Sequence, residues 1–326
     1  MLMFRRRATI SSISLMLFCA DAALGQATST VSGQAFPGRP LRKGTSSAGG
    51  GSDFAARLVA QGLNERFGQQ VIVENRPGVL SVETAIKAQP DGYTLYLDGN
   101  SFWLTPLLKK VSYEVMRDFS PVTLAATSPY VLGAHPSLTA NSINELIALA
   151  KSRPGQLNYG SAGTGGGQHL AGELFKSMTG VNIVHVPYKA ISMAVTSLIG
   201  GEIQLIFATG ISVAPHLKSN KMKALAVSSA QPSALLPGVP TVAATVPGFE
   251  FAARTGIFTP GKPPAAIVTR LNQEIVRVLN LPDVKEKFLN VGAEIVGSSV
   301  PDFTVRLQSE VSRMGKVIKD AGIRLD

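Results

Sequence analysis

Two glycine-rich stretches offer the clearest chemistry in this sequence, and each stands just before an expected helix. The first covers residues 47–53 and reads Ser-Ala-Gly-Gly-Gly-Ser-Asp. Glycines have no Cβ, so backbone N–H groups can converge on a ligand, and the helix N-terminus adds a partial positive charge. A flexible loop in which Ser52 or Asp53 only caps the helix explains the stretch equally well. The candidate contacts for a carboxylate or phosphate are Ala48, Gly49, Gly50, Gly51, Ser52 and Asp53.

The second stretch, residues 161–169, reads Ser-Ala-Gly-Thr-Gly-Gly-Gly-Gln-His. It is a second glycine-rich loop between an expected strand and an expected helix. Ser161 and Thr164 supply hydroxyl groups, and Ala162 and Gly163 belong to the same loop. His169 stands at the helix start, where a histidine is more often a capping or packing residue than a ligand. Two anion sites at separate strand–helix junctions could hold the two ends of one small diacid.

Motifs of enzymes do not fit this sequence. Neither stretch has the Gly-Lys-Ser/Thr of a phosphate-binding loop, and Gln168 interrupts a dinucleotide-binding glycine pattern. No G-x-S-x-G nucleophile motif is present, and the four histidines lack the spacing of a zinc site. We therefore expect no enzymatic activity, no catalytic residue, no metal site and no cofactor.

The N-terminus has the pattern of an export signal. Arg5, Arg6 and Arg7 precede an apolar run over residues 10–20, and small residues follow it. This predicts a cleaved signal peptide over residues 1–25 and a periplasmic protein. The run is too short for a membrane span, and Phe18 before Cys19 disfavours a lipoprotein.

The composition of the exported chain restricts its chemistry further. Cys19 is the sole cysteine of the 326 residues, so disulfides and thiol catalysis are excluded after cleavage. Loss of three arginines and Asp21 with the leader lowers the net charge from +10 to +8. The lysines and arginines are scattered, which favours a solvated surface attractive to anionic solutes over a nucleic-acid interface.

From about residue 36, strand-like runs alternate with helical periodicity. This alternation predicts an α/β fold with parallel strands, in which ligands bind at the C-terminal ends of the strands. Strands are expected at residues 71–74, 94–97, 121–134, 157–159, 181–186, 203–207, 224–227 and 249–258. Helices are expected at residues 53–67, 143–151, 169–179, 194–199, 265–279 and 301–321.

Seven motifs occur in one order that resembles a known family. They are residues 74–78 (ENRPG), 90–94 (PDGYT), 135–137 (HPS), 155–163 (GQLNYGSAG), 169–176 (HLAGELFK), 184–189 (VHVPYK) and 236–241 (LPGVPT). The set resembles the substrate-binding proteins of tripartite tricarboxylate transporters, the Bug family. The resemblance runs from about residue 36 to the end of the chain.

The resemblance implies a type II-like periplasmic-binding-protein (Venus-flytrap) fold with two lobes of mixed sheets flanked by helices. Lobe I would comprise residues 36–127 plus 252–326, and lobe II residues 128–251. The implied solute is a di- or tricarboxylate, an acidic amino acid or an aromatic acid. The implied partner is a membrane transporter with one large and one small integral subunit, served by a monomeric receptor.

Carried over from the family, the first glycine loop holds the carboxylate mainly through backbone groups. The loop over residues 161–169 completes the cleft, and Tyr188 in the segment 186–189 lies near it. Three departures stand out in this sequence. Lys43, Gly44 and Ser46 occupy an expected central strand and make it a poor one. The turn after residue 78 is about three residues shorter, and Ala208 replaces an expected aspartate.

Two other interpretations stay open at the level of sequence. The same fold could serve as a solute sensor that presents its ligand to a membrane signalling partner. The diverged first strand and shortened turn could instead mark a degenerate paralogue that has lost binding.

Overall fold

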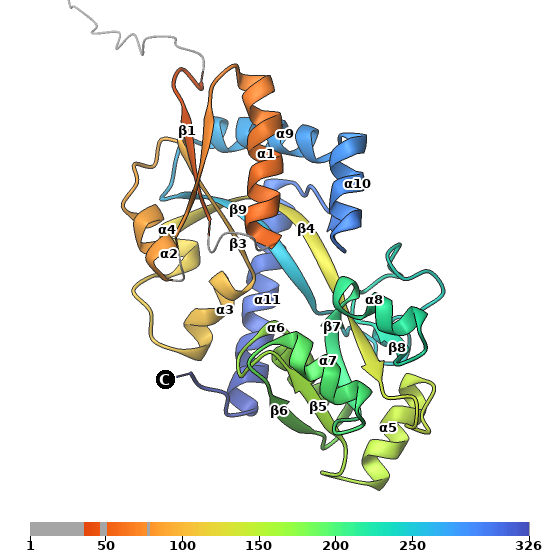
Figure 1. Cartoon of the computed structure of the whole chain (residues 1–326). Helices are drawn as coiled ribbons and strands as arrows, with labels where there is room; N and C mark the ends of the chain where they lie inside the picture. Colours follow the sequence, from red (N-terminus) through yellow and green to blue (C-terminus); the bar gives the residue numbers. More distant parts are fainter. Residues whose placement is uncertain (1–35, 46–50, 77–78, 326) are drawn as a thin grey trace, which may run out of the picture. The chain divides into compact units, whose positions relative to one another are not determined.

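The computed structural model of the chain describes residues 36–45, 51–76 and 79–325 (Figure 1). The predicted signal peptide, residues 1–25, lies outside the described residues. Ala48, Gly49 and Gly50 of the first glycine loop also lie outside them. Residues from Phe36 onward form one compact unit.

Strands and helices alternate along this unit as the sequence predicts. The strands are β1 (Leu41–Thr45), β2 (Val71–Asn75), β3 (Thr94–Gly99), β4 (Phe119–Ala134), β5 (Asn158–Ser161), β6 (Val184–Pro187), β7 (Leu205–Thr209), β8 (Lys223–Val227), β9 (Ala252–Pro260) and β10 (Glu294–Ile295). The helices are α1 (Gly51–Phe67), α2 (Val79–Ile86), α3 (Ser101–Leu108), α4 (Val115–Asp118), α5 (Ile143–Ser152), α6 (Gly167–Thr179), α7 (Ile191–Ile199), α8 (Gly210–Lys218), the 3₁₀ turn η1 (Val242–Ala244), α9 (Ala265–Leu279), α10 (Pro282–Asn290) and α11 (Val300–Asp320).

The strands pair in the order β2-β1-β3-β9-β4-β7-β5-β6, and β10 and β8 also pair with β4. Pairing is parallel among β1, β2 and β3 and among β5, β6 and β7, whereas β9 and β4 run antiparallel to their neighbours. The long strand β4 pairs with β9 up to Pro129 and with β7 from Tyr130 onward, so it belongs to both halves of the mixed sheet (Figure 1). This is the two-lobed α/β architecture that the resemblance implies. The proposed lobe boundaries stay a prediction.

Helices cover both faces of the sheet and bury its apolar residues. On one face α1, α9 and α10 enclose a core that includes Val59, Leu95 and Ile275. On the other face α11 packs against β4, α3 and α6, and buries Trp103 and Phe258. No helix in the described ranges is long and apolar enough to cross a lipid bilayer.

Several boundaries follow local rules that the sequence displays. The predicted helix over residues 265–279 coincides with α9, and Ser142 caps α5 by accepting a hydrogen bond from Glu145 N at 3.2 Å. The short helices α2, α3, α4, α8 and α10 and the 3₁₀ turn η1 were not predicted. Two of them carry an internal proline, Pro106 in α3 and Pro215 in α8, which obscures the helical pattern.

The expectation of a poor first strand is corrected by the structure. β1 forms at the centre of the first half, between β2 and β3, with Leu41, Lys43 and Thr45 fully buried. The Lys43 ammonium reaches Ala56 O of α1 at 3.3 Å. Burial lowers the pKa of Lys43 well below its ordinary value. The strand therefore persists because its backbone pairs on both sides, although one of its side chains is costly to bury.

Candidate functional site

A large pocket lies beside β4 and β9, where the two halves of the sheet meet. We call it the central pocket; its volume is about 580 Å³. Its polar lining residues are Ser52, Asn100, Thr127, Ser128, Thr209, Arg254 and Thr255. Its apolar and glycine lining residues are Gly51, Phe54, Gly99, Ala126, Ile211, Ala253, Phe288, Val291 and Ala293.

Three helices begin at the central pocket. Gly51 and Ser52 form the first turn of α1, Asn100 is the N-cap of α3, and Thr209 is the N-cap of α8. The first N–H groups of a helix have no partner within the helix, and its N-terminus carries a partial positive charge. The pocket therefore has a positive potential and backbone N–H donors from three helix N-termini, although no lysine is among its described lining residues. Such a site suits a carboxylate or another small anion.

Arg254 is the cationic side chain in the lining, and it is already paired. Its guanidinium binds Glu310 Oε1 at 2.8 Å and Glu250 Oε1 at 2.5 Å, and Trp103 Nε1 donates to the other oxygen of Glu310 at 3.1 Å. Arg254 and Glu310 are both more than nine-tenths buried. This network fixes β9 against α3 and α11. Arg254 thus shapes the wall of the pocket more than it supplies free charge.

Asp53 of the first glycine stretch is held by contacts with Arg57 and Asn75. Its carboxylate pairs with Arg57 at 3.1 Å and accepts a hydrogen bond from Asn75 Nδ2 at 2.8 Å. Arg57 in turn donates to Asn75 Oδ1 at 3.0 Å. This cluster joins the start of α1 to the end of β2, which gives Asp53 a structural role and leaves Gly51 and Ser52 facing the pocket.

The second glycine stretch gathers around the ends of β5 and β6. Ser161 is fully buried, and Tyr188 N donates to Ser161 O at 2.9 Å. The loop turns at Gly163, whose φ of +110° is a conformation that favours glycine. Gly165 N donates to His169 Nδ1 at 2.9 Å, so His169 holds the loop at the start of α6. Ala162 and Thr164 on this loop are exposed to solvent.

A serine–histidine pair occurs in this second cluster, and its geometry is that of a structural contact. Ser161 Oγ lies 2.7 Å from His185 Nε2 and also donates to Gly163 O at 2.9 Å. With the serine proton directed to that carbonyl, His185 Nε2 is the donor to Ser161 and is not available as its general base. Burial and the nearby His169 ring, 3.8 Å away centre to centre, lower the pKa of His185 to about 4. Because Ser161 has no exposed surface, a substrate cannot reach its hydroxyl.

The structure thus places the predicted residues in two groups. Gly51 and Ser52 line the central pocket, whereas Ser161, Gly163, His169 and Tyr188 gather at the ends of β5 and β6. Assignment of either group as ligand contacts stays a prediction. The sequence reasoning missed the pocket residues on β4 and β9 and both caps, Asn100 and Thr209. Asn100 follows Asp-Gly at the end of an expected strand, which is the signal that could have identified it.

Two half-sheets that share strand β4, with an anion-suited pocket beside β4 and β9, define a solute-binding protein of the periplasmic type. The chain belongs to the tripartite tricarboxylate transporter receptor family, whose family model matches residues 55–323. This is a family of solute-binding receptors, not of enzymes.

Relatives of similar length support this membership. The chain is 33% identical over 319 residues to a UPF0065 protein in the tcbD–tcbE intergenic region of Pseudomonas sp. strain P51, covering 95% of each chain. It is 32% identical over 317 residues to the protein BugT of Bordetella pertussis, covering 95% of this chain and 96% of BugT.

Solved structures share both fold and sequence with this chain. Rpa4515 of R. palustris with adipate is 34% identical, with a TM-score of 0.70 over 89% of this chain and 99% of that one. MatC of Rhodopseudomonas palustris with bound malate is 27% identical, with a TM-score of 0.67 over 87% of this chain and 100% of that one.

Proposed function

We propose that this protein captures a small carboxylate solute in the central pocket and delivers it to a membrane transporter with one large and one small integral subunit. The observation that carries the proposal is the meeting of three helix N-termini, those of α1, α3 and α8, at one pocket of about 580 Å³. A carboxylate is stabilised there by backbone dipoles that are fixed before the ligand arrives. Adipate and malate, named with the two related structures, are carboxylates of fitting size.

The binding residues of this proposal come from both glycine stretches and from the strands between them. Gly51 and Ser52 supply N–H groups and a hydroxyl from α1. Thr127 and Ser128 supply hydroxyls from β4, the strand shared by both halves of the sheet. The loop bearing Ser161 and Thr164 is the proposed opposite wall through its exposed residues Ala162 and Thr164, with water bridging the remaining gaps.

The proposal includes export through the predicted leader and an absence of covalent chemistry. The buried Ser161–His185 contact supports the second point because its hydroxyl is engaged and inaccessible. A carboxylate held by neutral backbone donors is bound without being activated. Delivery then requires only that the solute dissociates at the transporter.

Calorimetric titration of the purified protein with adipate, malate and neutral amides of the same shape tests the binding. We expect saturable binding of at least one carboxylate and none of its amide. Ser52→Asp adds a charge that α1 tolerates at its N-terminus but that repels a bound anion, so affinity should fall by at least about tenfold. Ser52→Asn, which adds no charge, is the matched control and should bind nearly as the wild type does.

Binding of the amides alone would refute the carboxylate assignment. Equal affinities of the Ser52→Asp and Ser52→Asn variants would show that the ligand does not bind at the N-terminus of α1. Transport is tested separately in the source bacterium: deletion of this chain should abolish uptake of the labelled solute, and unchanged uptake would argue against a transport role.

A further inference from the structure

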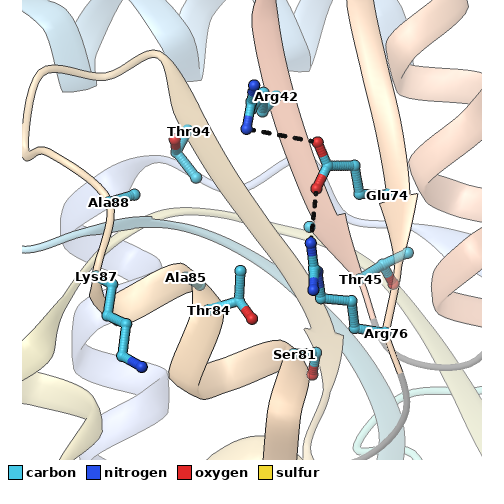
Figure 2. Close-up of a pocket in the computed structure, with 11 residues that line it drawn as sticks. Arg42, Thr45, Glu74, Arg76, Ser81, Thr84, Ala85, Lys87, Ala88 and Thr94 are labelled. Carbon is cyan, nitrogen blue, oxygen red and sulfur yellow. Dashed lines mark ion pairs between the residues drawn. The ribbon is translucent and has the colours of Figure 1, made fainter.

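A second cavity lies on the sheet face opposite α1, between α2 and strands β1, β2 and β3 (Figure 2). We call it the α2 pocket; its volume is about 210 Å³. Arg42 and Gly44 reach it from β1, and Arg76 follows β2. None of the described residues that line this pocket also lines the central pocket. It is therefore a separate site.

The α2 pocket exists because small residues meet at its centre. Gly44 has no side chain, and Ala85 and Ala88 face it from α2 and the residues after it. A Cβ added at Gly44 would lie 3.5 Å from Tyr96 Cδ2 and 3.9 Å from Leu95 O, which are ordinary contact distances. A larger residue would therefore fit at this position and fill the space. The glycine that was expected to weaken β1 instead opens a cavity beside it.

Positive charge dominates the lining of the α2 pocket. Arg42, Arg76 and Lys87 line it together with one carboxylate, Glu74. Figure 2 shows Glu74 between the two arginines, at 3.8 Å from Arg42 and 3.7 Å from Arg76. These distances are ion pairs without a hydrogen bond, so both guanidinium groups retain donors for another acceptor. Lys87 forms no ion pair with any residue in the described ranges.

We propose that the α2 pocket binds a small oxyanion with at least two negative charges, independently of the solute in the central pocket. Arg42 and Arg76 would share the oxyanion with Lys87, and the Thr94 hydroxyl would add a neutral donor. An anion of this charge offsets the net positive charge of the lining, whereas a neutral solute gains nothing from it. A free phosphate or sulfate and a short dicarboxylate share this chemistry.

Titration of the purified full chain with inorganic phosphate, sulfate and succinate at low ionic strength tests the proposal, because screening weakens exposed cations. Whether phosphate and sulfate or succinate bind more tightly shows whether the natural ligand is an inorganic oxyanion or a dicarboxylate. Crystals soaked in selenate locate the site directly by the anomalous signal of selenium, which we expect within contact of Arg76 and Lys87. Addition of salt should weaken binding.

Two variants test separately whether the cavity and its positive charge are needed for oxyanion binding. Gly44→Val fills the pocket without changing any charge and should weaken oxyanion binding by at least about tenfold. Lys87→Ala removes one exposed cation without disturbing the core and should weaken it by about tenfold. Lys285→Ala, an exposed lysine on α10, is the matched control and should leave binding unchanged. An absence of saturable binding, selenium outside the pocket, or binding that neither Gly44→Val nor Lys87→Ala weakens would each overturn the proposal.

Discussion

Replacement of Lys43 by methionine should stabilise this protein. Lys43 lies on the central strand β1 with no exposed surface, among apolar residues such as Leu41 and Val59. Its Nζ has a single hydrogen bond in the described part of the chain, to Ala56 O at 3.3 Å. Methionine has a similar length and an apolar end, so it fills the same space without a polar group to satisfy.

The size of the effect follows from this environment. Mutational data place the cost of burying a poorly bonded polar group at about 1–3 kcal/mol. The apolar stem of Lys43 is retained by methionine, so the packing of β1 against α1 changes little. We expect the free energy of unfolding at pH 7 to rise by about 1–3 kcal/mol, and Tm by about 2–12 °C for a chain of this size.

The pH dependence gives a sharper test than Tm alone. Burial lowers the pKa of Lys43 below 10.5, so between the folded and unfolded values the unfolded chain binds more protons. Stability of the wild type therefore increases as the pH rises toward 10.5, and the methionine variant lacks this contribution. The stability gap between the two proteins should narrow from pH 7 to pH 10.

Urea unfolding at several pH values, followed by the fluorescence of Trp103, measures this gap. Trp103 is the single tryptophan and is buried against α11, so its emission reports the loss of the core. Lys285→Met on the surface of α10 is the control and should change stability by less than about 0.5 kcal/mol. A destabilised Lys43→Met variant, or a gap independent of pH, would refute the view that Lys43 is an uncompensated buried amine.

Three further predictions concern packing and titration elsewhere in the fold. Glu310→Gln breaks the buried pair with Arg254 and should lower the free energy of unfolding by about 3–5 kcal/mol in urea melts; a loss under 1 kcal/mol would contradict its role. The pKa of His185, lowered to about 4, means that the unfolded chain binds more protons between pH 4 and 6.5, so stability should fall as the pH drops through this range. His185→Gln should reduce this loss of unfolding free energy by about 1–2 kcal/mol, a value lowered because His185 is partly exposed. If the variant has the same pH profile as the wild type, groups other than His185 cause the loss. Gly62→Ala places a Cβ 2.4 Å from Val278 Cγ1 and should cost about 1–3 kcal/mol in thermal melts, whereas a Val278→Ala background should restore most of it.

Local sequence signals were sufficient for much of the fold. The helix over residues 265–279 was predicted to the residue because its apolar positions repeat at helical spacing, and the Ser142 cap follows from a serine three residues before Glu145. Strand β4 was recognised as one long apolar run. Its division between two sets of partners was not visible, because pairing depends on strands distant in the sequence.

Only the tertiary structure decided how the candidate residues group. Both glycine stretches precede helices as predicted. However, the Asp53 carboxylate contacts Arg57 and Asn75, and the Ser161 hydroxyl contacts His185. Asp53–Arg57 is an i,i+4 pair within α1, but the Asp53–Asn75 and Ser161–His185 contacts join separate elements, so no local spacing in the sequence encodes those two.

The sequence by itself determined the alternation of strands and helices, the family resemblance and the two glycine-rich turns, because these depend on residue type and short-range order. The tertiary structure decided that Lys43 is buried while Arg42 beside it faces a cavity, because alternate residues of a strand point to opposite faces. It also decided that α1, α3 and α8 begin at one pocket. Helix N-termini converge only when the strands that precede them, here β1, β3 and β7, have been placed in the sheet.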